Sequence, residues 1–311
     1  MKRHSRPSLV YYAQKPALVN GNLRQTVRMP RRAALWMLIG IYAAARFLPL
    51  FQAKVPMLVI LTLHIAPPAI FAWIHGTARY GTRGILAFTL VCLGVGNLSE
   101  NLGVLTGFPF GHYNFTEVMG PKFLQVPILL GLAYVGIGYI SWVLGDLILG
   151  QMHRSRLLTL PLVAAFIMVA WDLSADPIWS TLVHAWIWLD GGSYFGVPLT
   201  NFFGWYLTVY VFYQLFALYL RRQPPGAIRL DVADSRLAVG FYAVCAGGNL
   251  LLLIPRPAAA LVVDAAGTPW KTSNLIGTCA LISVFLMGAF ALFAWVRAGE
   301  PLKHSPKLPH I

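Results

Sequence analysis

Long apolar runs, separated by short polar or Gly- and Pro-rich segments, are the main pattern of this chain. A helix rises about 1.5 Å per residue, and the hydrocarbon layer of a membrane is about 30 Å thick. Most of the runs are long enough to cross it. The pattern therefore predicts about eight transmembrane helices, at approximately residues 33–50, 55–75, 84–102, 126–149, 157–172, 201–220, 237–254 and 275–296.

Composition supports this interpretation. Of the 311 residues, 58% are hydrophobic and only 11% are charged, which is too apolar for a water-soluble globule of this length. We expect an all-α, polytopic integral membrane bundle. Residues 1–32 are expected to form a basic cytoplasmic tail without a cleaved signal peptide, residues 33–296 the transmembrane domain, and residues 297–311 a cytoplasmic C-terminal tail.

The net charge of +14 also bears on topology. Lys and Arg lie between the apolar runs and not along one face, which argues against nucleic-acid binding and favours contact with anionic lipid. With the N-terminus inside, nineteen of the 24 Lys and Arg residues are cytoplasmic, as the positive-inside rule requires. This asymmetry predicts an even number of spans with both termini cytoplasmic. Because haloarchaeal proteins usually have acidic surfaces, we expect a bacterial inner membrane.

Acidic residues are few, and three of them lie near the outer ends of predicted spans. Glu100 is near the end of the third span, and Asp172 and Asp176 share a helix face by their i,i+4 spacing. A carboxyl group near hydrocarbon costs several kcal/mol unless it is paired or neutralised, so a functional role is the default. We take these three as candidate catalytic residues. Asp176 precedes Pro177, and its alternative role is to terminate a helix and accept hydrogen bonds from the loop.

Asp146 has a different explanation. It lies near the cytoplasmic end of the fourth span, where an ion pair with Arg154 or Arg156 accounts for it. We therefore expect substitution of Asp146 by Asn to lower activity much less than the same substitution at Asp172.

Familiar metal and nucleotide motifs are missing from the sequence. There is no H-x-x-x-H or H-x-x-H-H cluster of the kind that iron oxygenases use, and Gly94-Val95-Gly96 lacks the third Gly of a nucleotide loop. Asp172 and Asp176 form a D-x-x-x-D motif similar to that of metal-dependent membrane prenyltransferases, but the outer face lacks the second Asp-rich motif. We expect neither a metal nor a cofactor.

Two outer connections, residues 103–125 and 173–200, are long and rich in aromatic residues. Aromatic faces stabilise a nearby cation by about 0.5–2 kcal/mol each. His112 is either a proton carrier or an interfacial side chain, and an interfacial belt is the expected role of Trp179, Trp186 and Trp188. The candidate substrate contacts in and beside these connections are Phe110, His112, Tyr113, Trp171, Tyr194, Asn201 and Trp205.

Three sequence motifs resemble those of a known family. They are E-N-x-G from residue 100, T-G-x-P-F-G-x-Y from residue 106 and Y-F-G-V-P-L-x-N-x-x-G-W from residue 194. Over about residues 35–295 the chain resembles the membrane carotenoid biosynthesis family, which includes the bacterioruberin-type carotenoid 1,2-hydratases. The resemblance implies cofactor-independent hydration of the C1,C2 double bond at an acyclic carotenoid end.

The candidate residues suit this reaction independently. Hydration of an alkene needs an acid, a pocket that tolerates a tertiary cation, and a water. A carboxylic acid withdrawn from water stays protonated more readily, which makes Glu100 and Asp172 candidates for the acid. We expect Asp172→Asn to lower activity about 100-fold or more. The alternatives are a non-catalytic carotenoid-binding or scaffold protein and, less favoured, a prenyltransferase. The carotenoid itself, the oligomeric state and the identity of the acid stay open at this stage.

Overall fold

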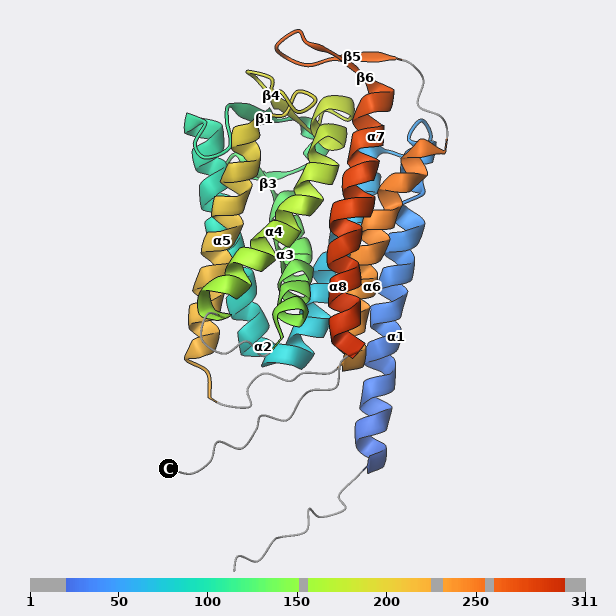
Figure 1. Cartoon of the computed structure of the whole chain (residues 1–311), viewed down its shortest axis with the longest axis vertical. Coiled ribbons are helices and arrows are strands. Elements are labelled where there is room, and N and C mark those ends of the chain that lie inside the picture. Colours follow the sequence, from blue (N-terminus) through green and yellow to red (C-terminus); the bar gives the residue numbers. More distant parts are fainter. Residues whose placement is uncertain (1–20, 151–155, 225–231, 255–259, 300–311) are drawn as a thin grey trace, which may run out of the picture.

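The computed structural model describes residues 21–150, 156–224, 232–254 and 260–299. Its helices run roughly along one axis and form a bundle (Figure 1). In these ranges seven helices are long and apolar enough to cross a membrane. The prediction of an all-α polytopic membrane bundle is confirmed.

The helices follow the predicted apolar runs closely. They are α1 (Gly21–Ala45), α2 (Met57–Thr106), α3 (Ile128–Leu149), α4 (Arg156–Pro177), α5 (Leu199–Arg221), α6 (Val232–Gly248), α7 (Thr272–Ile282) and α8 (Gly288–Gly299). Short helical turns complete several spans, namely η1 (Leu48–Phe51), η3 (Ile178–Leu182), η4 (Asn249–Leu253) and η5 (Ser283–Met287), the last of which joins α7 to α8. Helix α1 begins within the predicted basic tail, and residues 1–20 and 300–311 of the two predicted tails lie outside the described residues.

Helix α2 contains two of the predicted spans. Gly81 interrupts it with φ of 71° and ψ of 169°, a conformation that Gly adopts without the cost of a Cβ clash. Leu58 near the start of α2 packs against Gly120, while Gly103 near its end packs against Phe110 of the same outer connection. Both ends of α2 therefore lie on one side of the bundle. The helix folds back at Gly81, and seven helices give the eight predicted crossings.

The outer connections form a cap over one end of the bundle. Strand β1 (Tyr113–Phe115) pairs antiparallel with β4 (Trp186–Trp188), so the two aromatic connections are hydrogen-bonded to each other (Figure 1). Two further hairpins, β2 (Lys122–Phe123) with β3 (Val126–Pro127) and β5 (Leu261–Val263) with β6 (Pro269–Lys271), lie at the same end. The short 3-10 turn η2 (Glu117–Met119) lies between β1 and β2.

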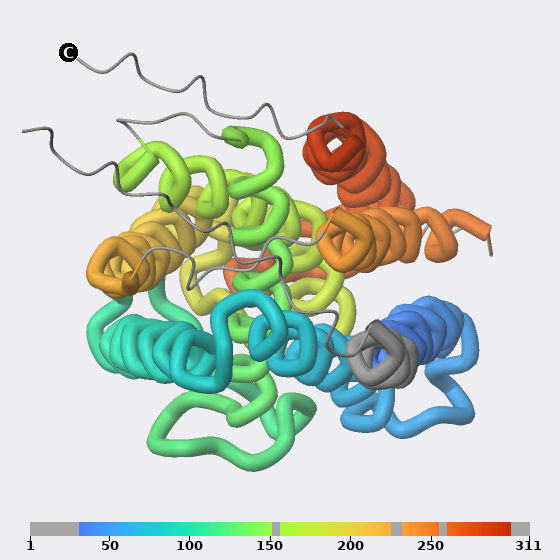
Figure 2. Tube along the Cα trace, turned by 90° about the horizontal axis from the view of Figure 1, so that it is seen from below, coloured from blue at the N-terminus to red at the C-terminus, as the bar shows by residue number. Residues whose placement is uncertain are grey.

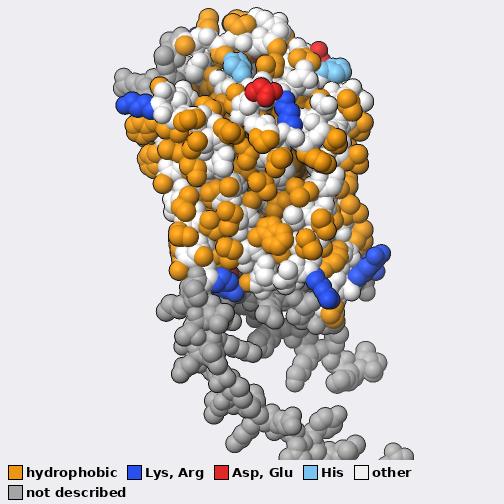
Figure 3. All heavy atoms as spheres, turned by 180° about the vertical axis from the view of Figure 1, so that it is seen from behind, with side chains coloured by type: hydrophobic (Ala, Val, Ile, Leu, Met, Phe, Trp, Pro, Cys, Tyr) orange, Lys and Arg blue, Asp and Glu red, His pale blue; other side chains and the backbone are white. Residues whose placement is uncertain are grey.

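Helix α3 runs through the middle of the bundle, with the other helices around it (Figure 2). Fifteen of its 22 residues are buried, including every residue from Ala133 to Asp146. By contrast, many large apolar side chains of the other helices are exposed. They form a broad apolar band, with Lys and Arg side chains at its lower and upper ends and few between (Figure 3). Such a surface is matched to lipid and not to water.

At the end of the bundle where α2 turns, Asp146 forms ion pairs with Arg79 and Arg156. The predicted pairing with Arg156 is confirmed, whereas Arg154 lies outside the described residues. Arg79 lies between the second and third predicted spans, but its side chain is only 3% exposed. Asp146 is therefore the carboxylate that balances a buried arginine.

The sidedness of the bundle leads to a prediction about topology. Reporter proteins fused after Arg156 or Arg236 should be cytoplasmic, and reporters inserted within residues 110–120 or 190–193 should be external, because Lys and Arg favour the cytoplasmic side. A paired alkaline phosphatase and green fluorescent protein assay measures this. Cytoplasmic signal from either aromatic connection would reverse the assigned orientation.

Candidate active site

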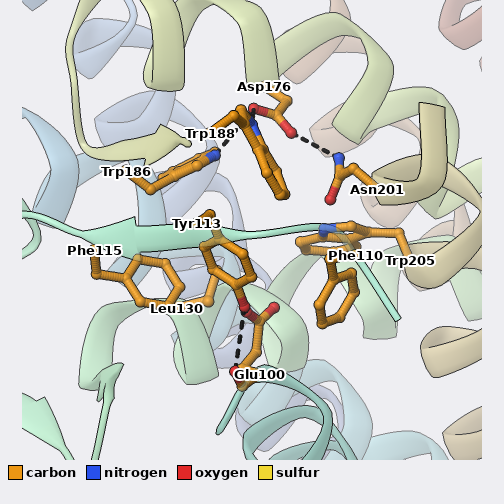
Figure 4. Close-up of a pocket in the computed structure, with 10 residues that line it drawn as sticks. All are labelled: Glu100, Phe110, Tyr113, Phe115, Leu130, Asp176, Trp186, Trp188, Asn201 and Trp205. Atoms are coloured by element: carbon orange, nitrogen blue, oxygen red, sulfur yellow. Dashed lines mark hydrogen bonds between the residues drawn. The ribbon is translucent and has the colours of Figure 1, made fainter. Parts of the chain in front are cut away.

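A small cavity lies beneath the β1–β4 cap (Figure 4). Residues from α2, α3, α4 and α5 line its walls, and residues of the two paired strands cover it. The lining consists of two acids, one amide, one leucine and six aromatic residues: Glu100, Phe110, Tyr113, Phe115, Leu130, Asp176, Trp186, Trp188, Asn201 and Trp205.

Glu100 projects from α2 near the C-terminal end of this helix and is only 3% exposed. Its two carboxyl oxygens accept hydrogen bonds from two phenols, Tyr134 at 2.6 Å from α3 and Tyr113 from β1. Burial, together with the adjacent Glu100, raises the pKa of Tyr113, so this phenol stays protonated. The ring of Tyr134 stacks on Trp205, with centroids 4.7 Å apart, which fixes the position of its hydroxyl group.

Asp176 projects from α4 on the other side of the cavity and is 1% exposed. Its Oδ1 accepts from the indole nitrogens of Trp186 at 3.0 Å and Trp188 at 3.2 Å, and its Oδ2 accepts from the side-chain amide of Asn201 at 2.7 Å. Because α4 extends to Pro177 and η3 continues from it, Asp176 does not terminate the helix. It does accept the loop hydrogen bonds that the sequence suggested.

Asp172 lies one helical turn before Asp176 and is also buried. Its Oδ2 accepts a hydrogen bond of 3.1 Å from the same amide nitrogen of Asn201 that donates to Asp176. Asp172 does not line the cavity. The Oδ1 atom of Asn201 is buried and has no hydrogen-bond partner. Since buried acceptors are usually satisfied, this atom is available to a ligand or to a water in the cavity.

Figure 4 shows Glu100 on one side of the cavity and Asp176 with Asn201 on the other, with the rings of Tyr113 and Trp205 between them. The lining includes no Lys or Arg. A positive charge that develops between the two carboxyl groups would therefore be stabilised by them and by the ring faces. In the part of the chain that the structure describes, no three His, Cys, Asp or Glu side chains are placed to share a metal ion.

The structure separates the predicted substrate contacts into two groups. His112 is exposed and pairs with Asp190 at 2.7 Å, outside the cavity. Tyr194 donates from its hydroxyl to the Leu173 carbonyl at 2.9 Å and also lies outside the lining, and Trp171 lines a neighbouring cavity instead. The predicted contacts that do line the cavity are Phe110, Tyr113, Asn201 and Trp205.

Sequence reasoning missed five residues of the site, namely Phe115, Leu130, Tyr134, Trp186 and Trp188. Trp186 and Trp188 were assigned to an interfacial belt, which is wrong, because both line the cavity and bond Asp176. Their i,i+2 spacing was a usable signal, since alternate residues of a strand share one face. Tyr134 carried no such signal, because a tyrosine in an apolar helix reveals its partner only when the helices pack.

Comparison with known proteins assigns this chain to a family. A family model described as carotenoid biosynthesis protein matches residues 54–266, which is more than half of the chain. The chain belongs to the carotenoid biosynthesis protein family. The family predicted from the three sequence motifs is thus confirmed, and all three motifs lie within the matched residues. Both acids of the cavity also lie within them.

One curated relative in this comparison is the bisanhydrobacterioruberin hydratase of the archaeon Haloarcula japonica. It is 31% identical over 139 residues, which cover 44% of this chain and 45% of the relative. The match therefore spans less than half the length of either protein. No solved structure matches the chain.

Proposed function

We propose that this family member hydrates the terminal C1,C2 double bond of an acyclic carotenoid end group without a cofactor. The observation that carries the proposal is the pair of buried acids, Glu100 and Asp176, on opposite sides of an aromatic cavity that holds a free acceptor on Asn201. Membership of a carotenoid biosynthesis family and a relative named as a hydratase support it. The membrane we propose is a bacterial cell membrane.

We assign the acid to Glu100 from its hydrogen-bond partners. A phenol hydroxyl can donate or accept, so the hydroxyls of Tyr113 and Tyr134 can bond Glu100 in either protonation state. Asp176 instead faces two indole N–H groups and one amide N–H, which only donate. These three donors favour the carboxylate form of Asp176. Glu100 is thus the group that can carry a proton to the alkene.

The first step transfers the proton of Glu100 to C2 of the end group. The π electrons of the C1,C2 bond form the new C–H bond, and C1 becomes a tertiary cation. The carboxylate of Asp176 and the faces of Trp205 and Tyr113 stabilise this cation in a cavity whose lining is mostly aromatic. No electron is gained or lost.

The second step adds water to C1. The free Oδ1 of Asn201 accepts a hydrogen bond from this water and orients its oxygen toward the cation. When the C–O bond forms, the water loses one proton, which returns to the carboxyl pair and restores the proton of Glu100. Asp172 acts as a positioning residue, since it holds the Asn201 amide from the side away from the cavity.

The reaction predicts the source of the oxygen in the product. In a host that makes lycopene, pigment should gain the mass of one water, about 18 Da, for each end hydrated. Purified protein should catalyse this anaerobically, with a chelator present and without added nucleotide or flavin. Label from H₂¹⁸O should enter the alcohol. Label from ¹⁸O₂ in its place would reject hydration, and binding of pigment without any mass change would favour a carotenoid-binding protein.

A further inference from the structure

A second cavity lies beside the first. Leu130 and Trp186 line both cavities and form the wall between them. Most of the remaining lining is apolar or aromatic and includes Leu61, Ile65 and Trp171. Such a lining suits a hydrocarbon chain. It also contains polar atoms that no protein group satisfies.

His64 supplies the first of these atoms. It lines the cavity, is only 7% exposed, and its Nδ1 lies 2.7 Å from the carbonyl oxygen of Ile60. Because a carbonyl only accepts, Nδ1 carries the hydrogen, and Nε2 of the neutral ring presents a lone pair. Nε2 is buried and has no partner. His64 therefore offers a hydrogen-bond acceptor to a ligand.

Arg46 supplies the second. Its Nη2 donates to the side-chain oxygen of Asn249, whereas its Nε is buried and has no partner. The guanidinium passes so close to Gly248 that a Cβ there would lie 1.8 Å from Nε, so this approach requires glycine. The guanidinium carbon and the His64 ring lie 5.9 Å and 6.1 Å from the centroid of the Tyr42 ring. Arg46 and His64 thus both lie beside the ring of Tyr42, which also lines the cavity.

These two atoms together select the chemistry of the ligand. A carboxylate or a fully ionised phosphate could accept from Arg46 but has no proton to donate to the lone pair of His64. A hydroxyl group does both, because its hydrogen donates and its oxygen accepts. The rest of the lining accommodates an apolar chain that ends on this hydroxyl.

We infer that the second cavity is a subsite for the hydroxylated end of a carotenoid, with the tertiary alcohol hydrogen-bonded between His64 and Arg46. The inference rests on the proposed function, whose product is this alcohol. The shared wall of Leu130 and Trp186 places the subsite next to the cavity in which the alcohol forms. The protein then binds the hydroxylated end of the product at a site separate from the cavity that binds the unhydrated end of the substrate.

The test compares two acyclic carotenoids of equal polyene length, one with hydrocarbon ends and one with a tertiary hydroxyl at one end. Each carotenoid is titrated into the full-length Glu100→Gln variant in lipid nanodiscs. The mass of the pigment is measured afterwards to show that no hydration has occurred. The hydroxylated carotenoid should bind about 10-fold more tightly, the scale of one buried hydrogen bond. His64→Leu should remove this preference, and His64→Gln, which restores an acceptor, should recover part of it.

Leu61→Ala is the matched control, because Leu61 lines the same cavity without a polar atom. It should weaken binding of both carotenoids equally. Equal affinity for the two carotenoids before any change at His64 would overturn the subsite, as would an equal loss for both in His64→Leu. If the hydroxylated carotenoid binds more tightly but the unmodified chain does not hydrate carotenoids, only the proposed reaction is rejected. If the unmodified chain hydrates carotenoids but the two carotenoids bind equally, only the subsite is rejected.

Discussion

Glu100→Gln should lower the rate of carotenoid hydration by about 10²–10⁴-fold, the usual range for loss of a general acid. The amide has nearly the same size and can still bond the hydroxyls of Tyr113 and Tyr134. What it lacks is the transferable proton. Single-turnover measurement of product mass against time separates this chemical defect from changes in binding or folding.

Glu117→Gln is the matched control for this substitution. Glu117 lies in the same outer cap, but its side chain is 97% exposed and only pairs with Lys122 at 3.6 Å. This variant should keep nearly unchanged turnover. If Glu100→Gln also keeps it, Glu100 is not the acid, and the assignment moves to Asp176 or Asp172. Asp172→Asn should lower the rate about 100-fold through the orientation of Asn201.

Asp146→Asn should destabilise the folded protein by about 3–5 kcal/mol, the cost of leaving one member of a buried ion pair without its partner. Arg79 is only 3% exposed and loses its counter-charge in this variant, whereas Arg156 is 32% exposed and can reach water. Thermal unfolding in detergent and the fraction of protein that elutes as a single species measure the loss. The expectation from sequence concerned activity only and did not include the buried charge of Arg79.

A paired replacement tests the reason for that loss. Asp146→Leu combined with Arg79→Met removes both buried charges and should recover much of the stability that either single change removes. Asp146→Leu alone should be the least stable of the set. Unchanged stability of Asp146→Asn would show that Arg79 does not depend on this carboxylate.

The span bounds were predictable because entry into a membrane depends on the average hydropathy of a local segment. Each predicted run contains or overlaps an observed helix, and the turn between the second and third runs lies at Gly81. The same reasoning identified Glu100, Asp172 and Asp176, because a carboxyl group at the end of an apolar run can be recognised from the linear sequence. The three sequence motifs were enough to indicate the family.

The partners of these acids were decided only by tertiary structure. Pairing of β1 with β4 joins residues about 75 positions apart, for example Tyr113 with Trp188, and it carries two indole N–H groups to Asp176. Asn201 reaches Asp176 only because α5 packs on α4. Hydrogen bonds and ion pairs depend on distances of about 3 Å between groups remote in sequence, which local hydropathy does not specify. Sequence alone therefore determined which segments cross the membrane, and packing determined which acid faces the cavity.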